Sequence, residues 1–252
     1  MLYLAAVFWM CVVVLSASGV YFLWTGMVKA RIVNIVLLPG TLAAQLGHVL
    51  GMLVTGGTVE GTSLISDDES ASPKQSASGK PRIPVVGPLI VGVLPLLTCA
   101  GGIVLSTLLL GGPSVNDLVV GEVLRNVPVG VPAFWDLLHN LIDLMEQMLI
   151  VAGHAGGANW QVWLFMYLLV CLTVRMAPLP GNLRGALAAI ATFGLIAFLA
   201  GLVFAPTRGL VERGWSMLSL TVITLMLLLV ISALIRGAVA LGRVILNRPG
   251  SV

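Results

Sequence analysis

Long stretches without a charged side chain alternate with short polar stretches along this chain. Charged residues are absent from residues 1–28, 32–59, 83–116, 147–174, 185–207 and 214–235. Each interval holds the roughly 20 apolar residues with which a helix crosses the hydrocarbon of a bilayer. Because a chain in lipid must satisfy its own backbone hydrogen bonds, these intervals predict helices rather than isolated strands. We therefore predict an all-α polytopic membrane protein.

The pattern predicts about six transmembrane helices, at residues 2–24, 35–55, 85–110, 160–173, 183–204 and 217–234. The last has the composition to continue as one long helix past Arg236 and Arg243. Pro39 and Gly40 should break the second helix near its start, or delay its beginning and leave Thr41 as the N-cap.

Two polar segments interrupt what is otherwise a single integral membrane domain over residues 1–252. Residues 57–83 combine charges with Ser and Pro and predict an extramembrane loop. Residues 134–151 predict one amphipathic helix, because polar and apolar side chains each recur there at three-to-four spacing. That helix should lie on the membrane surface or against the bundle, since crossing would require protein to shield its polar stripe.

Composition supports a membrane protein and excludes nucleic-acid binding. Of the 252 residues, 58% are hydrophobic and 9% are charged, whereas soluble domains carry about 25% charged residues. The net charge of +3 comes from scattered Lys and Arg side chains, with no basic run of the kind that nucleic acid requires. The expected partners are the lipid bilayer and a membrane protein.

One apolar segment contains a recognisable sequence motif. Residues 38–51 read Leu-Pro-Gly-Thr-Leu-Ala-Ala-Gln-Leu-Gly-His-Val-Leu-Gly. This stretch resembles the zinc-binding helix of the site-2-protease-like intramembrane metalloproteases, in which His-Glu-x-x-His places two ligands and a general base on one helical face. Ala44 and Gln45 stand where that family has the first His and the Glu, and only His48 remains.

A second segment resembles the same family and departs from it in the same direction. In site-2-like proteases an Asp from a later helix, within a Pro-containing run, completes the zinc site. The run from Met176 to Ala186 looks similar, and the Asp maps to Asn182 or to Arg184. Neither is a carboxylate. The resemblance therefore implies a site-2-protease-like core with a degenerate site, no catalytic residue and no cofactor.

The histidines allow a second interpretation. His48, with weaker contributions from His139 or His154 and an acidic side chain, would form an unusual zinc site. The simpler alternative places His48 in a helix contact, His139 on a solvated helix face and His154 in a turn. A catalytic zinc needs three protein ligands and one open position, so His48 alone does not provide a site.

The leading hypothesis is an inactive protease-like protein of a bacterial cytoplasmic membrane, which binds a membrane partner or serves as a subunit of a membrane complex. The alternatives are an active zinc metalloprotease with non-standard ligands, and a small-solute transporter or channel. The sequence leaves orientation open. Lys29 and Arg31 mark one cytoplasmic end, and Arg236, Arg243 and Arg248 mark another, but six crossings would put them on opposite sides.

Overall fold

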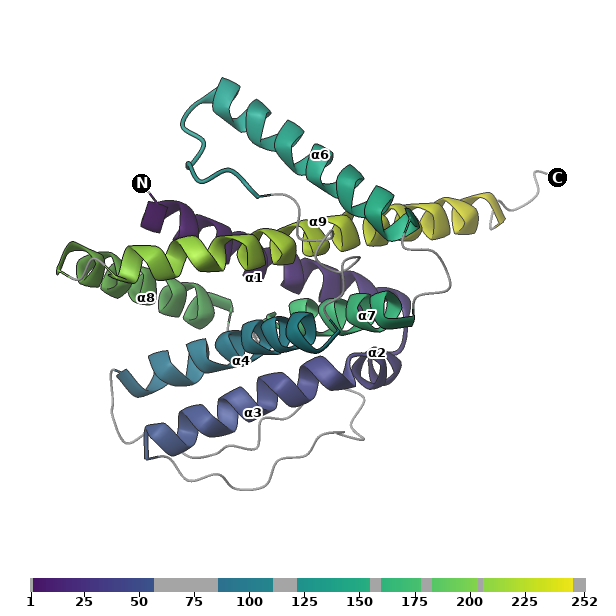
Figure 1. The fold of residues 1–252 in the computed structure, drawn as a ribbon. Coiled ribbons are helices and arrows are strands. Elements are labelled where there is room, and N and C mark those ends of the chain that lie inside the picture. Colours follow the sequence, from purple (N-terminus) through teal and green to yellow (C-terminus); the bar gives the residue numbers. More distant parts are fainter. Residues whose placement is uncertain are drawn as a thin grey trace.

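The computed structural model describes residues 2–56, 86–110, 122–154, 160–177, 183–203 and 206–246. Within these residues the ordered elements are helices (Figure 1). They are α1 (Leu2–Met27), α2 (Ala30–Val36), α3 (Leu38–Val54), α4 (Val86–Leu110), α6 (Val131–His154), α7 (Trp160–Val174), α8 (Leu183–Val203) and α9 (Pro206–Leu246). The predicted loop at residues 57–83 lies outside the described residues, so its structure stays a prediction.

The structure supports fewer membrane spans than the six predicted. In the described residues, Leu2–Met27, Gly87–Leu110 and Val211–Gly242 are long and apolar enough to cross a bilayer, and α2 with α3 adds a fourth if the bent pair is one span. The described apolar stretches of the other two, Trp160–Val174 and Leu187–Leu199, are shorter. A 15-residue helix is about 22 Å long at 1.5 Å per residue, less than the roughly 30 Å of a hydrocarbon core.

The predicted break in the second apolar interval is confirmed. The axes of α2 and α3 differ by 81°, and the junction falls at Leu37, with proline in the first turn of α3. Thr41 is not the N-cap, because its hydroxyl donates to the Leu37 carbonyl at 3.0 Å from inside the helix. A helix tolerates proline in its first turn, because the N–H groups there have no partner within the helix. The helix α3 can therefore begin before Thr41.

Two sets of packed helices make up the bundle. In one set α3 lies against α4 and α7, and in the other α1 lies against α9 and α8 (Figure 1). The long apolar run that was predicted to extend past Arg236 does so, because α9 continues to Leu246. The helix α6 packs mainly on α9 and leans away from the rest of the bundle.

Large apolar side chains cover much of the outer surface. Leu108 is 75% exposed, and Phe22 and Leu234 are each 68% exposed. Soluble proteins rarely leave apolar patches of such extent open to water. Together with the long apolar helices, this surface identifies an integral membrane protein whose outer face contacts lipid.

Candidate functional site

One face of α3 consists of small side chains. Gly40, Ala44, Gly47 and Gly51 follow one another at spacings of four, three and four, which places them on the same helical face. A Cβ atom added to Gly47 would overlap the Thr98 hydroxyl and lie 2.7 Å from the Pro95 Cα. We call these four residues the α3 seam.

The α3 seam holds the helix directly against two neighbours. A Cβ on Gly51 would lie 3.0 Å from the Val91 Cα in α4, and one on Gly40 would lie 2.6 Å from the Cys171 carbonyl carbon in α7. Ala44 is partly buried and packs against the core. Small residues let the backbones of membrane helices approach closely, so the seam has a packing role that accounts for Ala44 and Gly47.

The polar residues of the same stretch lie beside the seam. Gln45 and His48 are both half-buried. The Nε2 atom of His48 is buried and has no hydrogen-bond partner in the part of the chain that the structure describes. His48 therefore offers one ligand atom at most, where a zinc site needs three.

The other two histidines belong to α6 and bond to their own helix. The Nδ1 atoms of His139 and His154 lie 3.0 Å from the Trp135 carbonyl and 2.7 Å from the Ile150 carbonyl. Both side chains are exposed. In Figure 1 α6 and α3 lie on opposite sides of the bundle, so the structure does not bring either histidine to His48.

The structure describes only part of the run from Met176 to Ala186. Asn182 lies outside the described residues, and Arg184 is described as part of α8 without its side chain. Across the described ranges, no group of three or more His, Cys, Asp or Glu side chains is placed to hold a metal ion. A zinc site on His48 would need ligands from elsewhere in the chain.

A polar cluster that the sequence analysis missed surrounds the bend between α2 and α3. The Arg175 guanidinium donates from Nη2 to the Asn34 side-chain oxygen at 2.5 Å and lies 5.3 Å from the centre of the Tyr21 ring. The signal was present in the sequence, because Arg175 directly follows the charge-free interval 147–174 and Asn34 is a polar residue near the start of the interval 32–59. We call Tyr21, Asn34 and Arg175 the bend cluster.

The helix α7 contributes two further contacts at this bend. The Tyr167 hydroxyl donates to the Val36 carbonyl at 2.7 Å, and the Cys171 thiol donates to the same oxygen at 3.4 Å. Val36 is the last residue of α2. The end of α2 is therefore fixed to α7 from two positions, while Arg175 reaches back to Asn34 within α2.

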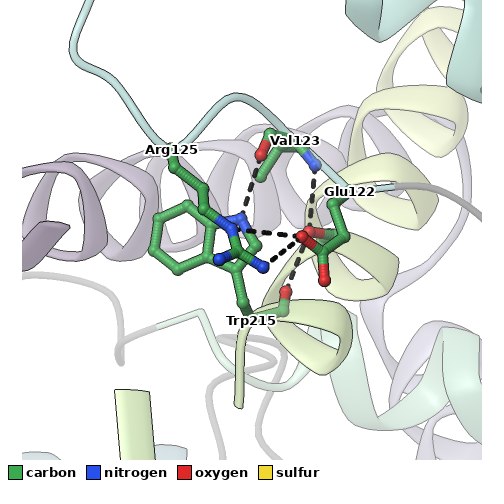
Figure 2. Close-up of polar contacts among 5 residues, drawn as sticks. Glu122, Val123, Arg125 and Trp215 are labelled. Atoms are coloured by element: carbon green, nitrogen blue, oxygen red, sulfur yellow. Dashed lines mark hydrogen bonds and ion pairs between the residues drawn. The ribbon is translucent and has the colours of Figure 1, made fainter. Parts of the chain in front are cut away.

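Two tryptophans anchor the non-helical residues 122–130 on α1 and α9. The Trp215 indole N–H donates to the Val123 carbonyl at 2.9 Å, and the Val123 N–H donates to the Ser219 hydroxyl at 3.0 Å (Figure 2). From α1, Trp9 donates to the Leu124 carbonyl at 2.9 Å. The backbone of this segment is therefore satisfied by protein, which buried irregular chain requires.

An ion pair closes the same segment on its exposed side. Arg125 donates to a Glu122 carboxylate oxygen from Nε at 3.1 Å and from Nη2 at 2.5 Å, and its guanidinium lies over the Trp215 ring (Figure 2). Both side chains are nearly half exposed. Exposed pairs of this kind contribute about 0–1 kcal/mol, so the tryptophans are the stronger anchors.

No family model, curated protein or solved structure matches this chain in the three comparisons with known proteins.

Proposed function

We propose that this chain is a non-catalytic, multi-pass protein of a bacterial cytoplasmic membrane. In this proposal its helices descend from a site-2-protease-like scaffold, and it binds a second membrane protein. The observation that carries the proposal is the α3 seam. At the position where the resembled family has its first zinc ligand, Ala44 is partly buried against the core, on the same helical face as the closely packed Gly40 and Gly47.

The departure at Gln45 supports the same conclusion. The family's Glu removes a proton from the metal-bound water, whereas a Gln side chain has no basic oxygen at neutral pH. His48 retains one free nitrogen among the described residues. That nitrogen keeps a zinc enzyme with unusual ligands as the second candidate function.

The helix α6 is the best-supported partner surface. Leu137, Leu141, Leu144 and Met148 are its buried residues. On another side, Phe134, Trp135, Ile142 and Leu149 are each more than half exposed. Asp136, Asp143 and Glu146 form a third, acidic side. Aromatic residues are enriched where proteins contact one another, so Phe134 and Trp135 mark the contact that we propose.

Metal content separates the two candidate functions. We expect the purified protein to contain far less than one equivalent of zinc, and the His48→Ala variant to contain the same amount. One equivalent of zinc in the wild type, lost in His48→Ala, would overturn the non-catalytic proposal. The neighbouring Gln45→Ala variant controls for indirect loss of the fold.

Site-specific photo-crosslinking tests the partner surface. A photoreactive residue in place of Trp135 should yield one discrete protein adduct in native membranes. Leu195 on α8 is 58% exposed, close to the 61% of Trp135, and serves as the lipid-facing control that should yield lipid adducts only. Lipid adducts alone at both positions would contradict partner binding through α6.

A further inference from the structure

The first and last described helices run in the same direction. A Cβ on Gly19 would lie 3.2 Å from a Leu229 methyl, and the Trp24 indole donates to the Ser232 hydroxyl at 2.7 Å. Residue numbers rise together on both helices, so α1 and α9 are parallel. Figure 1 shows them side by side.

This arrangement brings two basic regions to one end of the bundle. A Cβ on Gly26 would lie 3.4 Å from the Arg236 guanidinium, which also lies over the Phe22 ring at 5.8 Å from its centre. Lys29 and Arg31 follow directly after α1, and both are exposed. We call this the basic end of the molecule.

The basic end gathers positive charge from two parts of the sequence. Residues 22–36 and 230–246 contain Lys29, Arg31, Arg236 and Arg243, and neither range contains an Asp or Glu. The opposite end is more balanced. The beginning of α9 carries Glu212 beside Arg213, and Glu122 pairs with Arg125 close to Trp215.

A surface with this distribution of charge attracts anionic lipids. Short segments next to membrane helices are richer in Lys and Arg on the cytoplasmic side, where anionic lipids attract cations within about a Debye length. We propose that the basic end faces the cytoplasm and contacts the phosphate groups of anionic lipids in that leaflet, which places the start of α1 on the other side.

This orientation removes the conflict between the two charge signals in the sequence. Six crossings would have separated Lys29 and Arg31 from Arg236 by the membrane. Parallel pairing of α1 with α9 instead requires an odd number of crossings between them. Of the described helices, α4 is then the one that crosses between them, the bent α2–α3 pair enters and leaves the membrane on the same side, and the shorter α7 and α8 are not separate spans.

Sidedness is tested with two matched positions on α9. An added Cβ meets no heavy atom within 4 Å at Gly209 or at Gly237, so Gly209→Cys and Gly237→Cys should both fold. The free cysteines Cys11, Cys99 and Cys171 are first replaced by alanine. A membrane-impermeant maleimide should label Gly237→Cys only in inverted vesicles and Gly209→Cys only in right-side-out vesicles.

A third variant, Val28→Cys at the end of α1, must label from the same side as Gly237→Cys. The reverse sidedness would overturn the orientation. Labelling of Val28→Cys and Gly237→Cys from different sides would overturn the common basic end itself.

Lipid contact is tested in vesicles of phosphatidylcholine with and without phosphatidylglycerol. Phosphatidylglycerol should raise the unfolding temperature of the wild type and leave that of the Lys29→Gln, Arg31→Gln, Arg236→Gln triple variant unchanged. Arg213→Gln, at the other end, should keep the wild-type shift. Inorganic phosphate added to phosphatidylcholine vesicles should have no effect. An equal shift in wild type and triple variant, or no shift in either, would overturn the lipid contact.

Discussion

At the scale of single residues, the atoms that face a glycine decide whether a larger residue could replace it. Gly47 faces backbone and near-backbone atoms of α4, with the Leu94 carbonyl oxygen 2.8 Å from the position of an added Cβ. Gly101 in α4 faces nothing within 4 Å. The same residue type is therefore a packing requirement at one position and dispensable at the other.

We expect Gly47→Ala to lower the free energy of unfolding by about 1–3 kcal/mol, the usual cost of overpacking a close contact. Gly101→Ala is the control and should be neutral or stabilising by about 0.5–1 kcal/mol, because alanine favours a helix over glycine. Unfolding in sodium dodecyl sulfate, followed by tryptophan fluorescence, measures both. Equal effects of the two substitutions would argue against the α3 seam.

The bend cluster leads to a second residue-scale prediction. Asn34→Leu removes the acceptor of a buried guanidinium and should cost about 1.5–3 kcal/mol, as expected for a hydrogen bond to a charged group. Adding Arg175→Met to that variant removes the stranded charge, so the double variant should be more stable than Asn34→Leu alone. Strictly additive losses in this double-mutant cycle would show that the two side chains do not interact.

At the scale of elements, α6 is a helix with three distinct sides. Its polar side was predictable from periodicity, which needs only local sequence. The apolar side opposite the polar side was predictable as well, and its members Leu137, Leu141, Leu144 and Met148 are the buried residues of α6. The second apolar side was not predicted, and Leu149 there is 52% exposed against 7% for Leu144. That difference depends on α9, a helix more than 50 residues away along the chain.

Truncation of these two leucines tests the assignment of the sides. Leu144→Ala should destabilise the protein by about 2–5 kcal/mol, since it opens a cavity against α9. Leu149→Ala should change stability by about 0.5 kcal/mol or less, as for exposed positions. The measurement is again detergent-induced unfolding, and a larger loss for Leu149→Ala would mean that the buried side is assigned wrongly.

The helices themselves were largely predictable, and the bend at Pro39 and Gly40 was as well, because charge-free intervals and proline act locally. The candidate site was less so. The sequence of α3 is compatible with a degenerate protease motif or with a packing seam made of Gly40, Ala44, Gly47 and Gly51. It does not specify which helix the seam contacts. Arg175 and Asn34 lie 141 positions apart, a distance across which no spacing rule applies.

At the scale of the whole molecule, an apolar exterior predicts how the protein behaves during extraction. We expect it to remain in the membrane pellet after an alkaline carbonate wash and to enter solution only with detergent, because its exposed leucines and phenylalanines require lipid. Immunoblotting of pellet and supernatant measures this. Recovery in the carbonate supernatant would contradict an integral membrane protein.

The hydrogen bond from Trp24 to Ser232 joins residues 208 positions apart. This separation determines how long after the synthesis of α1 its contact with α9 can form. A ribosome adding 5–20 residues per second needs roughly 10–40 s to travel between them. Throughout that interval the inner face of α1, with Trp9, Val13 and Val20, has no α9 to cover it. The nascent chain must therefore shelter that face in lipid, in the insertion machinery or against the helices between α1 and α9 until α9 has been translated.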